Sequence, residues 1–330
     1  MDYQRPQRVS VLDPIEPAIE RVRLILFQPF DISKWLTIGF CAWLAILGQG
    51  GGSGFNFRFP GGKHPFGPGG PEIPGLSAIR EIILTHLPLI IIGAAVIIPI
   101  IIIIGLVLCW LRSRGQFMFV HCVAGNAAEV TIPWKKFSRH GNSLFVFKIV
   151  FSIISMMIIL IPIVLVVITF ITLQAAGLTV AGVAGVMSAG FVVFLVAVAL
   201  LLVVKFTNDF VVPIMFLQTS SVVAGWRTFL KLLGVNKARI VLYILFQIVI
   251  SMVISFIVLI IYFIGFCACC LSCCISILLI IPLVNLVVLY FVTLVLLPLI
   301  TFKRAYSLFY FSQFGPQFNV FTVQAGAGQC

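Results

Sequence analysis

The chain has 330 residues, of which 62% are apolar and only 9% are charged. Soluble domains contain about 25% charged residues, so nine acids and 21 bases are too few to coat a soluble protein of this length. Lipid must therefore solvate most of the surface. The net charge of +12 does not indicate nucleic-acid binding, because the bases lie in short segments between apolar runs. Bases in such places are typical topology signals and contact anionic headgroups.

Six apolar runs have the length expected of transmembrane helices. The first run is the weakest, since only residues 35–47 are cleanly apolar. Six crossings would place 18 of the 21 lysines and arginines in the cytoplasm, whereas a first run that does not cross would leave 13 there. The positive-inside rule therefore predicts six spans with both termini in the cytoplasm. The runs cover residues 32–48, 82–111, 143–173, 178–204, 240–266 and 275–301.

This topology predicts three parts along the chain. Residues 1–31 form a cytoplasmic N-terminal arm with an amphipathic helix, and its mixed charge does not fit a cleavable signal peptide. Residues 32–302 form the six-span membrane domain, and residues 303–330 form a cytoplasmic tail. Within the membrane domain, residues 48–75 hold 11 glycines and five prolines and are predicted to be an external loop. The predicted cytoplasmic interfacial segments are 112–142 and 205–239.

A similar unit occurs three times, each time as an amphipathic segment followed by two apolar runs. The first amphipathic segment covers residues 13–28, and the other two share a pattern of Trp, base, Phe and base. Because Trp and Phe three residues apart share one helical face, we expect these helices to lie in the cytoplasmic membrane interface. Their rings would then enter the acyl boundary and their bases would lie among headgroups. The residues concerned are Trp134, Lys135, Phe137, Arg139, Trp226, Arg227, Phe229 and Lys231.

The predicted fold class is accordingly an all-α membrane protein. It is a six-helix transmembrane bundle built from three pseudo-repeated units, each an interfacial helix plus a transmembrane hairpin.

Polar residues within the apolar runs are few, and such residues are the first candidates for function in a membrane protein. Gln247 and Asn285 lie within runs, His86 lies near one end of a run, and Lys205, Asn208 and Asp209 follow the inner end of the fourth run. Lys205 and Asp209 lie four residues apart and can neutralise each other on a helix. Asn285 follows Pro282 by three residues and can bond a carbonyl freed by the kink. No carboxylate lies in the middle of a run, which argues against an ion-coupled pump.

Five cysteines cluster in the predicted external turn between the last two runs. In order they are Cys267, Cys269, Cys270, Cys273 and Cys274. Cysteine packs as a small apolar residue, which suits a tight hairpin within lipid. Disulfides in an oxidising compartment, lipid attachment and a metal at the C-x-x-C spacing are the alternatives. No His, Asp or Glu lies nearby to complete a metal site.

No enzyme motif is present, and the four histidines lie in separate segments without metal-ligand spacing. We therefore expect no catalysis and no cofactor. The predicted function is a non-catalytic integral membrane protein that organises lipid or a partner protein at the cytoplasmic membrane. A transporter, channel or lipid-translocating permease is the alternative, favoured by prolines within the runs. The expected partners are the bilayer and anionic headgroups, with a protein partner or homo-oligomer also open, and no nucleic acid.

Two further segments carry a family resemblance. Residues 209–215 read DFVVPIM, and residues 302–308 read FKRAYSL before QFGP at 313–316. With the Gly-rich loop, they resemble a family of uncharacterised bacterial polytopic inner-membrane proteins, itself distantly similar to the membrane domain of glycerophosphodiester phosphodiesterases. The resemblance covers nearly the whole chain and implies a bacterial inner-membrane location and a six-helix-like bundle. It implies no catalytic residues, since the phosphodiesterase barrel lies outside that domain and this chain lacks one.

Overall fold

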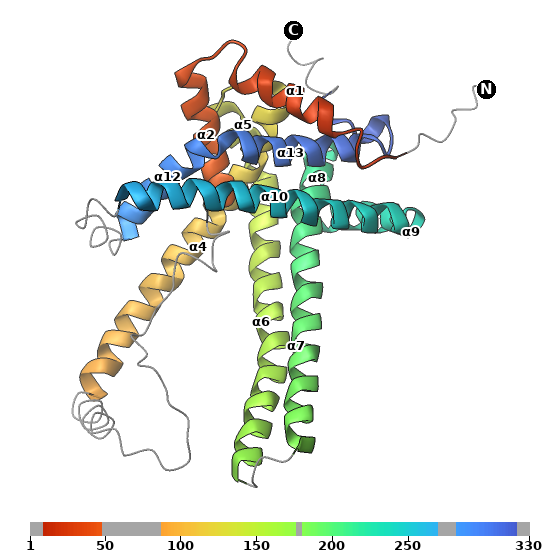
Figure 1. Cartoon of the computed structure of the whole chain (residues 1–330). Helices are drawn as coiled ribbons and strands as arrows, with labels where there is room; N and C mark the ends of the chain where they lie inside the picture. The colour runs from red at the N-terminus through yellow and green to blue at the C-terminus, as the bar shows by residue number, and fades with distance from the viewer. Residues whose placement is uncertain (1–8, 48–86, 176–179, 270–281, 322–330) are drawn as a thin grey trace.

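The computed structural model describes residues 9–47, 87–175, 180–269 and 282–321 (Figure 1). Within these ranges the chain is helical and contains no strand, which confirms the predicted all-α class. The elements are α1 (Ile15–Leu26), α2 (Ile32–Ile46), α4 (Leu87–Gly125), α5 (Thr131–Lys136), α6 (Ser138–Ala175), α7 (Val180–Phe206), the π-helix η1 (Thr207–Val211), α8 (Val212–Gln218), α9 (Val222–Val235), α10 (Lys237–Cys269), α12 (Pro282–Val295), α13 (Leu297–Ser312) and the 3-10 turn η2 (Pro316–Phe318).

Four described helices are long and apolar enough to cross a membrane. A fifth span results if α12 and α13, which meet at a bend of 70°, are counted as one. These helices fit a multi-pass membrane protein, but the described residues do not confirm the six-span bundle. The four spans are Ile91–Gly125, Ser138–Thr172, Ala184–Gln218 and Lys237–Ile261.

Three of these helices extend away from the rest of the molecule as apolar arms, which we define as residues 87–108 of α4, 150–175 of α6 and 180–204 of α7. The arms of α6 and α7 run side by side, and α4 diverges from them (Figure 1). Large apolar side chains along the arms are more than half exposed, for example Ile101, Leu165 and Phe194. Exposing so continuous an apolar surface to water would be unfavourable, so we infer that lipid surrounds the arms.

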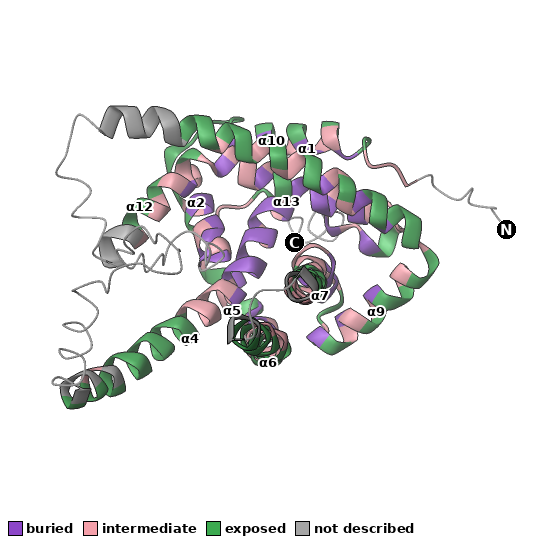
Figure 2. Cartoon of the chain, turned by 60° about the horizontal axis from the view of Figure 1, so that its bottom comes forward, coloured by how far each residue is buried: buried purple, intermediate pink, exposed green. Residues whose placement is uncertain are grey.

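The buried core lies at the other end of the molecule, in a region that we call the cap. The cap consists of α1, α2, α5, η1, α8, α9, α13 and η2, with the adjoining ends of α4, α6 and α10. Figure 2 shows the buried residues gathered here and the arm of α4 exposed along its length. The arms of α6 and α7 likewise carry exposed apolar side chains. Aromatic rings fill much of this core: Tyr243 stacks on Tyr310 at 4.4 Å between ring centroids, and Phe210 stacks on Phe229 at 5.1 Å.

The weakest predicted span, α2, lies in the cap beside the end of α4. A Cβ added at Gly115 would stand 2.7 Å from the backbone of Leu44, and the amine of Lys34 donates to the side-chain oxygen of Asn126 at 2.9 Å. Residues 115–126 come after the predicted second span, 82–111. The structure therefore does not pair α2 with that span as a hairpin. Its short length and small buried residues, such as Ala42, suit close packing on α4.

The last helices run in a different direction from the arms. Figures 1 and 2 both show α10 crossing the direction of α6 and α7 rather than running alongside them. After the bend, α13 continues to Ser312, with Ala305, Tyr306 and Phe311 fully buried. The first ten residues of the predicted cytoplasmic tail 303–330 therefore belong to the core, because their aromatic side chains pack in the cap.

Helix α1 closes the cap across the end of α4. Arg21 donates from Nε to the carbonyl oxygen of Val123 at 2.9 Å and from Nη2 to that of Ala124, so it caps the last turn of α4. Burial lowers the pKa of this guanidinium, but arginine keeps its proton at neutral pH. The Tyr306 hydroxyl donates to the carbonyl oxygen of Val11 at 2.8 Å, which joins α13 to the chain before α1.

Candidate functional site

The most unusual backbone in the described residues is the π-helix η1, where α7 enters the cap. The amide of Val212 donates to the carbonyl oxygen of Thr207, five residues back, as a π-helix requires. Pro213 comes next and has no N–H to donate. It therefore cannot donate to the carbonyl oxygen of Asn208, as a π-helix would require, or to that of Asp209, as an α-helix would require. Two successive carbonyl oxygens are left open for other donors.

Side chains on α13 occupy both open carbonyls. The Arg304 guanidinium donates from Nη1 to the carbonyl oxygen of Asn208 at 2.7 Å, and the Ser307 hydroxyl donates to that of Asp209 at 3.2 Å. Arg304 and Ser307 lie three residues apart and so share one face of α13. A buried backbone acceptor needs a partner, and Pro213 explains why the partner here is a side chain from another helix.

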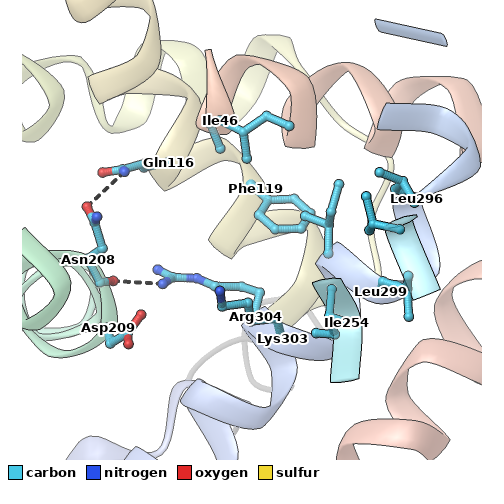
Figure 3. Close-up of a pocket in the computed structure, with 13 residues that line it drawn as sticks. Ile46, Gln116, Phe119, Asn208, Asp209, Ile254, Leu296, Leu299, Lys303 and Arg304 are labelled. Atoms are coloured by element: carbon cyan, nitrogen blue, oxygen red, sulfur yellow. Dashed lines mark hydrogen bonds between the residues drawn. The ribbon is translucent and has the colours of Figure 1, made fainter. Parts of the chain in front are cut away.

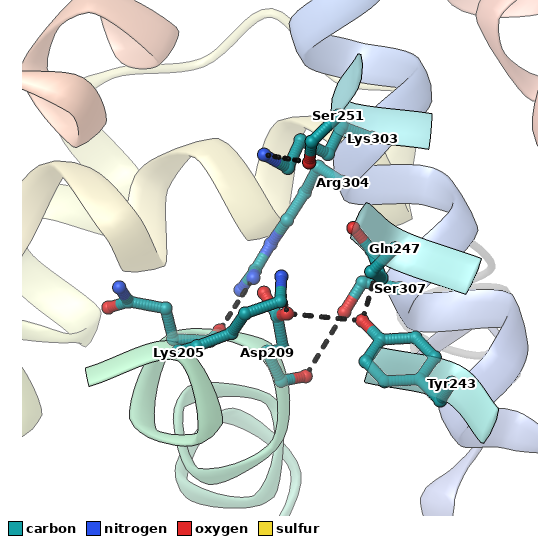
Figure 4. A network of polar contacts seen from close by, with 9 residues as sticks. Lys205, Asp209, Tyr243, Gln247, Ser251, Lys303, Arg304 and Ser307 are labelled. Carbon is teal, nitrogen blue, oxygen red and sulfur yellow. Dashed lines mark hydrogen bonds and ion pairs between the residues drawn. The ribbon is translucent and has the colours of Figure 1, made fainter. Parts of the chain in front are cut away.

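The Asp209 carboxylate is the centre of a second set of contacts (Figure 4). It forms an ion pair with Lys205 at 2.8 Å on the same helix, and it accepts a hydrogen bond from the Tyr243 hydroxyl at 3.1 Å. The Gln247 amide nitrogen donates to that hydroxyl, also at 3.1 Å. The predicted intramembrane polar residues Lys205, Asp209 and Gln247 are thus brought together by α7, η1 and α10.

A chain of amides connects the same π-helix to α4 and α6. The Lys148 amine donates to Gln116 Oε1 at 3.1 Å, and Gln116 Nε2 donates to Asn208 Oδ1 at 2.9 Å. Asn208 therefore accepts from α4 through its side chain and from α13 through its backbone. Five helical elements converge on one turn of π-helix through polar contacts, so this turn fixes how the arms join the cap.

A pocket of about 280 Å³ opens beside this cluster (Figure 3). Its polar side is formed by Gln116, Asn208, Asp209, Lys303 and Arg304. Its apolar side comes from α2, α4, α10 and the α12–α13 bend, through Ala45, Ile46, Phe119, Ile254, Val258, Leu296, Leu299 and Ile300. Figure 3 shows the Arg304 guanidinium reaching toward Asn208, with Phe119, Leu296 and Leu299 on the opposite side. The pocket is therefore amphipathic.

Positive charge exceeds negative charge in this cluster. Lys205, Lys303 and Arg304 surround the single carboxylate of Asp209, which leaves an excess of two positive charges. A part-buried excess of this kind is costly unless a counter-charge neutralises it. Within the described ranges, no three His, Cys, Asp or Glu side chains gather as a metal site would require. The arrangement is therefore suited to an anion.

The second predicted interfacial motif lies over the end of α4. The guanidinium of Arg114 lies over both Trp134 and Trp110, 4.8 Å and 4.4 Å from their ring centroids, and the two rings meet edge to face at 5.7 Å. Lys135 and Arg139 are exposed. Phe137 is buried between Phe117 and Phe216. Its ring therefore packs in protein rather than in the acyl boundary, because the helix breaks at Phe137 and turns it inward.

The third motif lies on α9, which has two distinct faces. Phe229 is fully buried against Phe206 and Phe210, each 5.1 Å away between centroids, so it too is in the core rather than in lipid. The opposite face is exposed, and a surface hollow there is lined by Val223, Trp226, Arg227, Leu230 and Lys231. The predicted bases are therefore exposed, and their place among headgroups stays a prediction; the predicted phenylalanines are buried in the cap rather than in lipid.

The remaining predictions lie where the structure describes little. Asn285 is in α12, but its side chain is outside the described part of the chain. Cys270, Cys273 and Cys274 lie outside the described residues, as do the side chains of Cys267 and Cys269 at the end of α10. The packing, disulfide, lipid and metal alternatives for this cluster stay predictions.

Sequence reasoning missed Arg304, Ser307 and Gln116, while Asn208 was among the polar residues expected at the inner end of the fourth run. The predicted tail boundary at 303 separated the first two from the membrane domain. One signal was present: Pro213 follows Asp209 by four residues and Asn208 by five, and a proline within a helix always frees an acceptor. Which side chain donates to that acceptor depends on the direction of α13, and hydrophobic periodicity does not predict that direction.

Comparison with known proteins identifies a family without naming an activity. No curated protein and no solved structure was found to match the chain. Residues 9–321 match a family of unknown function, DUF7544. This range includes α1, the arms, the π-helix and α13. The chain therefore belongs to the DUF7544 family.

Proposed function

We propose that this protein is a non-catalytic integral membrane module that organises anionic lipid at the cytoplasmic face of a bacterial inner membrane. In this proposal the arms lie in the bilayer and the amphipathic helices α1, α5 and α9 lie at its cytoplasmic interface, with both termini in the cytoplasm. The observation that carries it is the exposed face of α9, where bases and apolar side chains alternate.

That face has the chemistry of an interfacial helix. Val223 and Leu230 are exposed by 68% and 55%, although the opposite face of α9 buries Val222 and Phe229 in the cap. Arg227 and Lys231 lie one turn apart between and beside the exposed apolar residues. An apolar stripe flanked by bases suits the boundary between acyl chains and anionic headgroups. The exposed Lys135 and Arg139 add positive charge to the cap.

Quenching of Trp226 fluorescence by brominated lipid tests this proposal. The full chain would carry Trp226 as its single tryptophan, the other four being replaced by phenylalanine, and would be reconstituted in vesicles. We expect brominated phosphatidylglycerol in a phosphatidylcholine background to quench more strongly than the same fraction of brominated phosphatidylcholine, because Arg227 and Lys231 enrich anionic lipid around α9.

The matched control is the R227Q/K231Q variant of this single-tryptophan protein. It keeps the shape of both side chains near the ring but removes two charges, so the preference for the anionic lipid should disappear while quenching by brominated phosphatidylcholine persists. Equal quenching by both lipids in the unaltered single-tryptophan protein would contradict the proposal.

We also propose the finer topology of six crossings in three repeated units, which requires α2 and α10 to cross the bilayer as well, although α10 lies across the direction of the arms in Figure 1. What supports it is the order of elements, since α1, α5 and α9 each precede an apolar helix, together with the charge distribution along the chain. Single cysteines introduced into a cysteine-free chain at Lys135, Arg227 and Gly62 would be labelled with a membrane-impermeant maleimide in intact cells. Labelling at residue 62 alone is expected. Labelling at 135 or 227 would show that these segments lie outside the cytoplasm and would contradict the proposed orientation.

A further inference from the structure

The amphipathic pocket beside the π-helix is separate from the exposed face of α9 and differs from it in kind. Its polar side presents the Lys303 amine and the Arg304 guanidinium next to the amides of Gln116 and Asn208. Its other side consists of aliphatic residues and Phe119. Charge, neutral donors and apolar surface are thus within one hollow, as a site for an amphiphile requires.

The donors are positioned before any ligand binds. Arg304 is held by the carbonyl oxygen of Asn208 at 2.7 Å, and Lys303 contacts the Ser251 hydroxyl at 3.5 Å. A guanidinium has five N–H groups, and the contact to Asn208 uses one nitrogen. Holding the side chain in place lowers the entropy lost on binding. Guanidinium groups favour phosphate because its oxygens match their planar donors.

The charge balance also favours an anion. The three bases around Asp209 leave an excess of two positive charges in a region with apolar walls, and Asp209 is already bonded to Lys205 and Tyr243. A phosphodiester carries one negative charge and would offset part of this excess. A zwitterionic headgroup would bring its own positive group into the same hollow and would offset less.

The size of the pocket limits what enters it. Its volume of about 280 Å³ is just below the usual range for small-molecule sites, so it suits a phosphate-bearing headgroup rather than a whole lipid. The acyl chains would leave along α10, where Ile257 and Ile261 continue the helical face of the pocket residues Ile254 and Val258 and are each more than a third exposed. A lipid can therefore have its head in the pocket and its chains in the bilayer.

We propose that this pocket is a specific site for one anionic phospholipid, whose phosphodiester contacts Arg304 and Lys303 and whose chains lie along α10. This inference deepens the proposed function, on which it rests, by naming a saturable site and its ligand class. The α9 face attracts anionic lipid loosely, whereas the pocket retains one molecule.

Native mass spectrometry of the full chain in detergent tests the site. The protein is titrated with dihexanoyl phosphatidylglycerol, with dihexanoyl phosphatidylcholine, and with inorganic phosphate. We expect one phosphatidylglycerol per chain to saturate, with the phosphatidylcholine binding about tenfold more weakly or worse, because its choline group brings a further positive charge into the pocket. Binding of inorganic phosphate as tight as that of the lipid would overturn the acyl-chain part of the proposal, and equal binding of the two lipids would overturn the charge part.

Two variants locate the site. Arg304→Gln should weaken phosphatidylglycerol binding about tenfold by removing the guanidinium. Val258→Trp should abolish it by filling the pocket while every charge stays, which keeps the test valid if Arg304→Gln fails to fold. The matched control is Val253→Trp on the same helix, whose side chain is 56% exposed and does not line the pocket. Unchanged binding in Val258→Trp would place the lipid elsewhere and overturn the proposal.

The two proposals fail in different ways. R227Q/K231Q should remove the lipid preference sensed by Trp226 and leave the single retained lipid, while Val258→Trp should do the reverse. An anionic preference at Trp226 without any saturable lipid would overturn the pocket alone. A saturable lipid without that preference would overturn the α9 face alone.

Discussion

The cap and the arms contain similar apolar residues, but the cap buries them and the arms expose them. Phe229 in the cap is fully buried between other rings, whereas Phe194 in the arm of α7 is 61% exposed. Hydropathy alone does not distinguish the two. The difference lies in the neighbours: chain segments in the cap carry polar residues and helix breaks that let helices meet, while the arms are long helices with exposed apolar side chains whose glycines, such as Gly105, meet no other helix.

The comparison shows where protein stability resides in such a chain. A side chain that leaves lipid for another apolar surface gains little, because lipid tails are as apolar as leucine. A side chain that packs against rings and satisfied polar groups gains close contacts. We therefore expect substitutions in the cap to destabilise the fold and matched substitutions in the arms to have little effect.

The largest contrast is expected for phenylalanine. Phe229→Ala would leave a cavity between Phe206 and Phe210 and should lower the free energy of unfolding by about 3–5 kcal/mol. Phe194→Ala should change it by less than about 1 kcal/mol, since lipid or detergent fills the space. Unfolding titrations with sodium dodecyl sulfate in mixed micelles would measure both. Equal losses in the two variants would mean that the arm of α7 is packed against protein.

A second contrast lies within α4 itself. Gly115→Ala places a Cβ 2.6–2.8 Å from Leu44 and Ala45, including their backbone atoms, so α2 must shift, and we expect a loss of about 1–3 kcal/mol. Gly105→Ala meets nothing within 4 Å. It should leave stability unchanged or raise it slightly through better helix propensity. The same titrations apply. An unchanged free energy of unfolding in Gly115→Ala would show that α2 does not pack on α4 at this position.

The smallest contrast concerns single hydrogen bonds. Tyr306→Phe removes the donor to the Val11 carbonyl oxygen, which joins distant segments in the cap, and should cost about 1 kcal/mol. Thr169→Val removes a bond of 2.8 Å to the Leu165 carbonyl oxygen within the same helix of an arm. That carbonyl still has its helical partner, so we expect a loss below about 0.5 kcal/mol. A larger loss for Thr169→Val would indicate that its hydroxyl contacts protein.

The part of the fold that follows from local pattern was predictable. The apolar runs at 143–173, 178–204 and 240–266 correspond to α6, α7 and α10, because length and hydropathy are local properties. The direction of α10 was not predictable, since an apolar helix has the same pattern whether it runs along its neighbours or across them. The core role of Phe137 and Phe229 was also missed: a ring flanked by bases suits an interface or a core equally.

The candidate site was only half predictable for a related reason. Lys205 and Asp209 lie on one helix at a spacing that pairs them, and the structure shows that pair. Arg304 joins them from 95 positions further along the chain, through the bend between α12 and α13. Contacts of that separation depend on tertiary packing, which a single sequence does not reveal.

Pro213 has a consequence for how a cation is held in a chain with only nine acids. Its missing N–H and the return from the π to the α pattern together leave two peptide groups of its own helix as permanent neutral acceptors, and one of them anchors Arg304. A carboxylate in the same place would cancel the charge that it anchors and would vary with pH. A peptide oxygen does neither, so the guanidinium is fixed in position and keeps its full charge for whatever approaches from the other side.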